Sequence, residues 1–456
     1  MGCVDGLGRP CVEVGLDQRS SRARRALGFI AAALAIIACD DARPAVGDVA
    51  DGGPSTDAAM GSEDAATPEE APGLAVYPVR PVAIVDTRAE AAPCGAHAAL
   101  DATHSRIDVS LDACAGLELP PGAAAIAATL TLVPREPGAT IEVRAGAPQS
   151  ISSQPVMRAG PHDAWTSGLL TMLGASRTLR IESSNGAAAD VIVELTAVLA
   201  PPGPGARGVR FLERPVRLYT ARWDEAGVWH GPTSADVDER LALNEIAEEP
   251  LGALPGDVVG LIGVAHVGPD GLCDEGAFVS LGPARAEGDT RGLARIATCA
   301  PESTFPSRAS TAFVIGASAS QQLVLRAERA DALVYLDVAA YLVPYREGDA
   351  LYHPLASRIG AEIELGVAPR QVASSLAAGA IAASGRISAW SAGRGSLAAG
   401  AEPTTDAPSG PHTTLELRDG TSTTAFTTRL DANGAFVLEA DVEARLALAV
   451  DAYWAP

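Results

Sequence analysis

Two nonapeptides contain the residues that look most like parts of a binding site. The first, RPVAIVDTR, runs from Arg80 to Arg88, and RPVRLYTAR, from Arg214 to Arg222, repeats its Arg-Pro-Val start and its final Arg. The planar guanidinium of arginine can bind a carboxylate through two hydrogen bonds, so Arg88 and Asp86 could line a ligand groove. The same two residues could instead fix a turn, with Asp86 accepting backbone hydrogen bonds. Because the second copy keeps Arg222 and lacks the aspartate, we favour a structural role for all of these motif residues.

The N-terminal region has the chemistry of a lipidation signal. Four arginines between residues 19 and 25 precede the apolar run ALGFIAAALAIIA (26–38), which is too short to span a bilayer but suits a signal peptide. The run ends in IIAC at Cys39, which resembles a bacterial lipobox. That resemblance implies cleavage before Cys39 and acylation of this cysteine. The alternative is an ordinary signal peptide followed by an unrelated cysteine.

The stretch after Cys39 is acidic and has no hydrophobic period. It cannot bury enough apolar surface to fold, so we expect residues 39–73 to be a disordered tether that holds the folded part away from a membrane. Loss of residues 1–38 would remove five arginines and three acids, which changes the formal charge from −22 to 29 − 53 = −24.

Cysteine and histidine could form disulfides or hold a metal ion. Downstream of Cys39 there are four cysteines, which are Cys94, Cys114, Cys273 and Cys299. An even number in an exported protein indicates two disulfides, and each neighbouring pair falls within one repeat. A Cys/His metal site with His97 and His104 is the alternative. None of the seven histidines has the spacing of a zinc motif, so we expect disulfides and no metal.

Several classes of catalytic site are excluded by the composition. All 34 basic residues are arginine, so a GK[ST] phosphate loop, a Schiff-base lysine or a lysine general base cannot exist. Neither a Gly-x-Ser-x-Gly elbow nor a His-Glu-x-x-His motif occurs. An acidic chain without lysine is also poorly suited to nucleic acid. We expect a protein that is not an enzyme and has no cofactor.

Internal repeats indicate how the chain positions these residues. The nonapeptides lie 134 positions apart (214 − 80), LPPGAAAIAATLTLV (119–133) resembles LPGDVVGLIGVAHV (254–267), and three apolar segments end similarly at Pro201, Pro344 and Pro456. The third copy is the weakest, and in it YHPLASR places Arg358 136 positions after Arg222 (358 − 222). The repeats predict three β-sandwiches at 74–203, 204–345 and 346–456, the last of them degenerate.

Alternation of apolar and polar residues predicts the strands. RIDVSLD (106–112), AIAATLTL (125–132) and RLALAVDAYW (445–454) have period two, so each should bury one face and expose the other. Asn433-Gly434 predicts a hairpin. Residues 234–249 also fit a helix, but we prefer a strand at RLALNEI (240–246). The fold class is therefore all-β, with antiparallel sandwiches.

The VDTR phrase, the Pro-Gly turn and the closing strands such as LDVAAYL together resemble a domain repeated in cell-surface and secreted proteins of actinobacteria and myxobacteria. The resemblance covers 80–201 and 214–344 and is poor over 352–456. It implies non-catalytic modules, and no segment is left over for a hydrolase domain.

The sequence therefore predicts an exported protein, anchored in the cell envelope by a lipid on Cys39, with a structural or adhesive role. Its partners would be the membrane and another surface protein or a polysaccharide. The first alternative is glycan binding through Trp223 and Trp229, which flank a predicted loop, because sugars stack on tryptophan rings. An exported hydrolase with an unrecognised site is the third hypothesis. Trp454 belongs to the inward face of its strand and should be core.

Overall fold

The structure is a computed structural model. It describes the following residues: 72–89, 93–136, 140–149, 151, 155–159, 165–223, 229–230, 246–250, 254–269, 278–283, 294–297, 309–328, 332–366, 368–373, 376–393, 395–402, 413–417 and 420–456. The predicted signal peptide, nearly all of the predicted tether and residues 240–245 of the predicted strand at 240–246 lie outside this set. The described residues belong to one compact unit, Glu69–Pro456, so the predicted domain boundaries inside it remain predictions.

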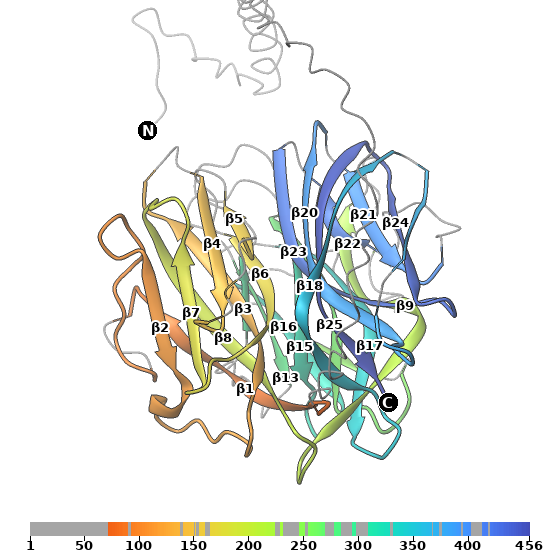
Figure 1. Cartoon of the computed structure of the whole chain (residues 1–456), viewed down its shortest axis with the longest axis horizontal. Coiled ribbons are helices and arrows are strands. Elements are labelled where there is room, and N and C mark those ends of the chain that lie inside the picture. The colour runs from red at the N-terminus through yellow and green to blue at the C-terminus, as the bar shows by residue number, and fades with distance from the viewer. Residues whose placement is uncertain are drawn as a thin grey trace, which may run out of the picture. The chain divides into compact units, whose positions relative to one another are not determined.

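The first sandwich lies between residues 75 and 200 and is orange to yellow-green in Figure 1. One sheet has the order β1 (Ala75–Asp86), β8 (Ala189–Ala200), β3 (Ala125–Pro134), β6 (Trp165–Met172). The other has the order β2 (Arg106–Ser110), β7 (Thr178–Ser183), β4 (Ile141–Gly146), β5 (Met157–Ala159), and a short 3-10 turn (Leu111–Ala113) follows β2. Ile107 and Val109 of β2 point into the core between the sheets, as the alternation predicts.

The second sandwich repeats this arrangement. Its first sheet has the order β9 (Arg207–Trp223), β17 (Ala332–Pro344), β12 (Gly260–Pro269), β15 (Ala309–Gly316), and the short β10 (Trp229–His230) pairs with β9. Its second sheet has the order β11 (Ile246–Pro250), β16 (Gln322–Glu328), β13 (Phe278–Pro283), β14 (Ala294–Ala297).

The third sandwich, in blue shades in Figure 1, has the same strand order again. Its sheets are β18 (Leu351–Leu365), β25 (Ala444–Ala455), β20 (Ala382–Ser391), β23 (Gly420–Arg429), and β19 (Arg370–Ala373), β24 (Ala435–Ala440), β21 (Gly395–Gly400), β22 (Thr413–Leu417). Without the two-residue β10, each sandwich has eight main strands. In all three sandwiches the first, eighth, third and sixth of these form one sheet, which we call the inner sheet, and the other four form the outer sheet. This is the strand order of a jelly roll. The prediction of all-β, antiparallel sandwiches is confirmed.

Strand register relates the copies to one another. The pairing of the third main strand with the eighth shifts by one residue at Ala127/Ala128, Ile262/Gly263 and Ser384/Gly385. The first and eighth strands also pair in the same way in two copies. Ala83 opposes Glu194 in the first sandwich, and Arg217 opposes Asp337 in the second, so the two nonapeptides align in space as they align in sequence.

The third copy of the phrase was assigned wrongly from the sequence. Tyr352 opposes Trp454, as Val76 opposes Leu199, and Ile359 opposes Val450, as Val82 opposes Leu195. Arg358 therefore precedes the counterpart of Val82 and does not correspond to Arg222. The spacing misled because the second copy is longer than the first. Val209 and Tyr352, which oppose Leu342 and Trp454, are equivalent residues and lie 143 positions apart (352 − 209), whereas Val76 and Val209 lie 133 apart (209 − 76).

Two further expectations are wrong for the inner sheets. The segments β3 and β25 are buried on both faces over most of their length, because the outward face of each inner sheet packs against the other sandwiches. Asn433-Gly434 does form a turn, with Gly434 at φ +73°, but the turn connects β23 and β24, which belong to different sheets, and no hairpin results. Trp454 is fully buried, as predicted.

The starts of the three first strands join the sandwiches in a closed ring. Val76 pairs with Arg207, Val209 with Ala350, and Leu74 with Tyr352, so each sandwich bonds to the next and the third bonds back to the first. The backbone N–H groups of Leu74 and Tyr352 donate to each other's carbonyl oxygens at 2.8 and 2.9 Å. An apolar cluster that includes Val76, Leu342 and Trp454 fills the space beneath these contacts.

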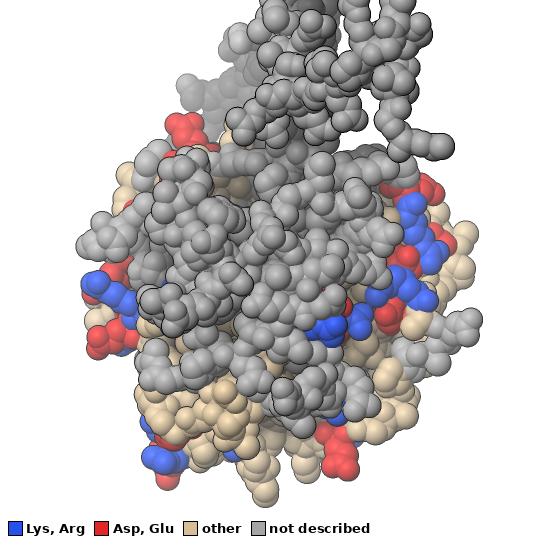
Figure 2. Space-filling model, turned by 180° about the vertical axis from the view of Figure 1, so that it is seen from behind, with Lys and Arg blue, Asp and Glu red and all other residues tan. Residues whose placement is uncertain are grey.

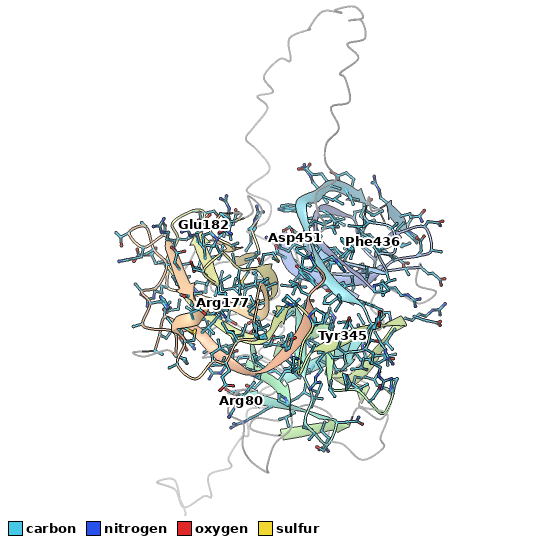
Figure 3. The ribbon with its side chains drawn as sticks, turned by 60° about the horizontal axis from the view of Figure 1, so that its bottom comes forward. Arg80, Arg177, Glu182, Tyr345, Phe436 and Asp451 are labelled. Carbon is cyan, nitrogen blue, oxygen red and sulfur yellow. A yellow bond between two sulfur atoms is a disulfide. The ribbon has the colours of Figure 1, made fainter. Side chains whose placement is uncertain are left out.

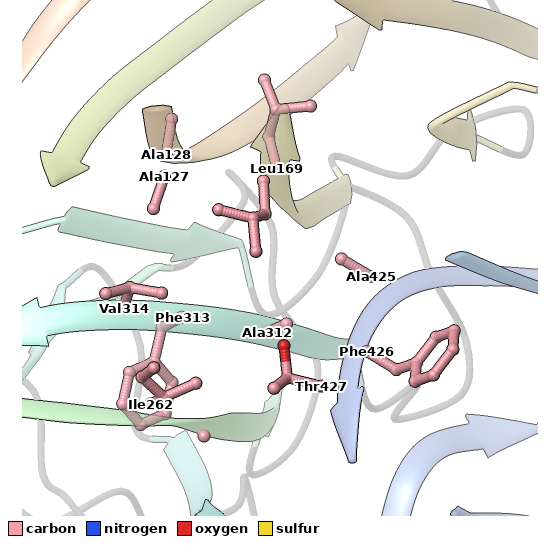
Figure 4. Close-up of a pocket in the computed structure, with 12 residues that line it drawn as sticks. Ala127, Ala128, Leu169, Ile262, Ala312, Phe313, Val314, Ala425, Phe426 and Thr427 are labelled. Carbon is pink, nitrogen blue, oxygen red and sulfur yellow. The ribbon is translucent and has the colours of Figure 1, made fainter. Parts of the chain in front are cut away.

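The sixth strands of the three sandwiches, β6, β15 and β23, meet inside the ring (Figure 4). Thr311 Oγ1 donates to the Thr166 carbonyl at 2.9 Å, and Thr424 Oγ1 donates to the Ser310 carbonyl at 3.1 Å. By register Thr166 and Ser310 are equivalent positions, so the two bonds are copies related by the repeat. The remaining gap is about 20 Å³ and is lined mainly by apolar side chains such as Leu169, Ile262 and Phe313, so it has room for little more than a water molecule.

Substitution of Gly168 tests this close approach. A Cβ at Gly168 would lie against the Ala312 carbonyl in the neighbouring sandwich, and backbone cannot yield as a flexible side chain does. We expect Gly168→Ala to lower the free energy of unfolding by roughly 1–3 kcal/mol through overpacking. The matched control is Gly256→Ala, whose new Cβ meets nothing within 4 Å. Equal urea midpoints for the two variants would show that the junction is looser than described.

Candidate functional site

Asp86, Thr87 and Arg88 close the end of β1. Asp86 Oδ1 accepts hydrogen bonds from Arg88 N at 3.0 Å and from its Nε at 3.1 Å. Thr87 Oγ1 donates to Asp190 at 2.8 Å and accepts from Val191 N at 3.0 Å, which ties the end of β1 to β8. Burial of Asp86 opposes ionisation, but the hydrogen bonds and charge of Arg88 outweigh it and lower the pKa of this carboxyl. The contacts between Asp86 and Arg88 stabilise a turn, and the contacts of Thr87 tie that turn to β8.

The motif arginines of the second copy have other surroundings. Arg214 lies 3.6 Å from Glu402, with both side chains well exposed. Arg222 pairs through its backbone with His230, and its side chain lies outside the description. The side chains of Trp223 and Trp229 also lie outside it, although their backbones are paired.

A buried ion pair in the second sandwich was missed from the sequence. Arg217 Nε and Nη2 donate to the two Asp337 oxygens at 2.7 and 2.8 Å, and the Arg217 guanidinium lies 4.6 Å from the Tyr335 ring centre. His266 Nε2 is 3.6 Å from the same carboxylate. Burial raises the pKa of Asp337 more than Arg217 lowers it. One feature of the sequence could have indicated this ion pair, because Arg217 occupies a position at which the first copy has alanine.

Cys94 and Cys114 form a disulfide, which confirms that pair. Cys39, Cys273 and Cys299 lie outside the described residues. His104 contacts Asp101, and no group of three or more metal-ligating side chains occurs in the part of the chain that the structure describes.

A hollow of about 360 Å³ lies between β1 and the residues on both sides of this disulfide. Val79, Arg80, Val82 and Ile84 contribute one wall. The remaining wall consists of residues on both sides of the disulfide, which are Pro93, Cys94, Cys114, Ala115, Gly116, Leu117 and Glu118. Arg80 lies at the outer edge of the first sandwich (Figure 3). The hollow thus adjoins the first motif arginine, which the sequence marked as structural.

Many charged side chains on the described surface lie close to side chains of opposite sign. Examples are Arg180 with Asp108 and Arg135 with Asp190, each at 2.7 Å, and Figure 2 shows basic and acidic groups adjacent at several places. Exposed pairs of this kind contribute about 1 kcal/mol or less each. No helix among the described residues has the length and apolarity needed to span a membrane.

Glu194 lies buried in the seam between the first and second sandwiches. It accepts a hydrogen bond from the backbone N–H of Arg295 on β14, and the Arg295 side chain lies 3.8 Å away. The carboxyls of Asp86 and Glu328 also act on it. Burial, which Arg295 only partly offsets, raises the pKa of Glu194 from its ordinary 4.5 to about 7.

Comparisons with known proteins identify no family. No family model matches the chain, and no curated protein matches it. Among solved structures, the tandem CBM22 domains of Xyn10C from Paenibacillus barcinonensis are 12% identical over 60% of this chain and 100% of theirs, with a TM-score of 0.17. A structure titled as the triple jelly roll fold and turret assembly in an archaeal virus is 7% identical over 84% and 90%, with a TM-score of 0.16. These scores are too low to support any inference about fold or function.

Removal of the disulfide tests its contribution to stability. The bond closes a loop of 20 positions, so the double variant Cys94→Ser, Cys114→Ser should lose roughly 3 kcal/mol on the chain-entropy account. Urea unfolding of the variant against the oxidised wild type measures the loss. Superimposable unfolding curves would contradict a stabilising role.

Substitution of Glu194 tests the seam between the sandwiches. The folded state holds the Glu194 proton more tightly than the unfolded state, so this carboxyl makes folding less favourable as pH rises from about 4.5 to about 7. Glu194→Gln keeps an oxygen for the Arg295 N–H and loses the charge. As pH rises through that window, the free energy of unfolding of the variant should therefore fall less steeply than that of the wild type, by about 1.4 kcal/mol per pH unit. Denaturant unfolding between pH 4 and 8 measures this, with exposed Glu443→Gln as the control. The same pH slope in all three proteins would contradict the buried position.

Proposed function

We propose that this chain is an exported protein, lipid-anchored in the cell envelope through Cys39, with a structural or adhesive role and no catalysis. Two features support export. One is the apolar run that ends in the lipobox-like IIAC at Cys39. The other is the Cys94–Cys114 disulfide, because disulfides persist in oxidising compartments and are rare in the cytosol.

The closed ring of sandwiches carries the structural part of the proposal. Several buried or half-buried polar side chains form hydrogen bonds to other strands. Thr311 and Thr424 hold adjacent sandwiches together, while Asp337 and Asp451 each receive two bonds from an arginine of the same sandwich. A unit held together in this way suits a rigid body that displays its loops at the end of a tether.

Glycan binding through Trp223 and Trp229 is the alternative proposal, and an exported hydrolase is the third. Nothing in the described residues favours either one, because both tryptophan side chains lie outside the description. The structural or adhesive role therefore remains the first choice.

Substitution of the anchor cysteine tests the proposal. In a bacterial host we expect Cys39→Ala to abolish labelling by a fatty-acid analogue and to move the protein out of the washed membrane fraction, because the acylated sulfur is gone. The matched control is Cys11→Ala, which lies within the predicted signal and should leave both unchanged. Undiminished labelling of the Cys39 variant would overturn the anchor.

A further inference from the structure

Two Asn-Gly pairs give the chain two places where a backbone nitrogen can react with a side chain. Of the three asparagines in the sequence, Asn185 and Asn433 are each followed by glycine. Both asparagines are exposed, and both glycines have a positive φ, +69° at Gly186 and +73° at Gly434. Because glycine has no Cβ, its nitrogen can approach the preceding side chain closely. The local sequence alone does not distinguish the two pairs.

The reaction that such a pair can undergo needs only water. The glycine nitrogen attacks Cγ of the asparagine and loses its proton, the bond between Cγ and Nδ2 breaks, and ammonia leaves. Water then opens the resulting succinimide ring at either carbonyl, which gives aspartate or isoaspartate. The net change replaces NH2 by OH and adds a carboxyl group that is ionised at neutral pH. In isoaspartate the main chain also becomes longer by one carbon.

Bonds to other parts of the first sandwich hold the carboxamide of Asn185. Its Nδ2 donates to the Thr140 carbonyl at 2.5 Å, and these residues lie 45 positions apart. Its Oδ1 accepts hydrogen bonds from Ser183 Oγ at 3.3 Å and from the Ala187 N–H at 3.4 Å. The Gly186 N–H, which would attack, donates to Ser183 Oγ at 3.1 Å. Rotation of this carboxamide toward Gly186 therefore breaks bonds to several residues.

The contacts of Asn433 stay within its own turn. Its N–H donates to Asp431 Oδ1 at 2.8 Å, and its side chain also bonds to Asp431. The Gly434 N–H donates to the Asp431 carbonyl at 3.1 Å, so the attacking nitrogen is bonded in both pairs. The difference lies in the carboxamide, because that of Asn433 is held by a residue two positions away and that of Asn185 by another strand segment.

We propose that Asn433 is a site of spontaneous deamidation to aspartate and isoaspartate, and that its bonds across the first sandwich protect Asn185. The proposal rests on these two turns and is independent of the lipid anchor.

The product disturbs the turn that joins the two sheets of the third sandwich. Asp431 Oδ1 accepts hydrogen bonds from Ala435 N and Asn433 N, each at 2.8 Å. These bonds, of which the bond from Ala435 acts most strongly, lower the pKa of Asp431, so its carboxylate is charged at neutral pH and repels a second carboxylate at position 433. The longer main chain of isoaspartate shifts Ala435 N relative to Asp431.

Peptide mapping of the folded full-length protein tests the proposal. All basic residues are arginine, so trypsin releases the peptides 181–207 and 430–445, each with a single asparagine. The protein would be aged in mildly alkaline buffer, then denatured and digested, and mass spectrometry would measure the exchange of NH2 for OH in both peptides. We expect 430–445 to react at least about fivefold faster, the effect of one hydrogen bond of typical strength. An isoaspartate methyltransferase should label the same peptide.

Two variants separate the causes, and circular dichroism melting checks that each one folds. Asn433→Gln should abolish the reaction in 430–445, because its longer side chain forms the larger ring far more slowly. Ser183→Ala removes the hydroxyl that bonds to both Asn185 and Gly186, so it should speed the reaction in 181–207 about fivefold.

The outcomes divide clearly. Faster exchange in 430–445 than in 181–207, lost in Asn433→Gln, supports the assignment. The proposal is overturned if 430–445 stays unchanged in the aged wild type, if the two peptides react at equal rates, or if 181–207 reacts first. An unaltered rate in folded Ser183→Ala contradicts the protection of Asn185.

Discussion

The close approach of β6, β15 and β23 is the constraint on which the rest of the fold depends. Three strands can meet around one line only if small side chains face it, and Gly168, Ala312 and Ala425 occupy equivalent positions there. A larger residue would push the sandwiches apart and open the contacts at the ring of first strands. The limit on side-chain size where the three sixth strands meet therefore determines how the sandwiches contact one another at the ring of first strands.

The same packing decides which polar groups the core can hold. At each equivalent place a hydroxyl or imidazole of the third strand bonds to a hydroxyl of the sixth strand: Thr131 with Thr166, His266 with Ser310, and Ser388 with Thr423. Buried hydroxyl groups are costly unless they are hydrogen-bonded. One geometric requirement is thus met with three different residue pairs, which hides the repeat from a search for identical residues.

Sequence reasoning predicted the individual strands well, but it predicted poorly which strand faces are buried against a neighbouring sandwich. The alternation in RIDVSLD and the match of RPVAIVDTR to RPVRLYTAR correspond to real strands in equivalent register. The burial of β3 on both faces could not be predicted, because Thr129 and Thr131 look like solvent-facing residues until a neighbouring sandwich covers them. The nearly equal arginine spacing at Arg358 misled because the second copy is longer than the first, with 143 positions from Val209 to Tyr352 (352 − 209) against 133 from Val76 to Val209 (209 − 76).

The candidate site was predictable only in part. The Cys94–Cys114 pair follows from cysteine number and compartment. Arg80 was singled out for its place in a repeated phrase, but the hollow beside it depends on how short β2 is and on where the disulfide places the next segment. Those are consequences of tertiary structure, and neither has a signature in the local sequence.

The closed ring has a consequence for how the chain acquires its structure during synthesis. The contact that completes the ring joins Leu74 to Tyr352, 278 positions later (352 − 74). The first sandwich can pair its own strands early, but the outward face of its inner sheet is covered first by the second sandwich and completely only when the third sandwich has emerged. Contacts between residues so far apart in sequence form slowly, because a long loop must close first. During that interval an apolar sheet face is open to association with other chains, so a delay in making the third sandwich exposes the first to aggregation.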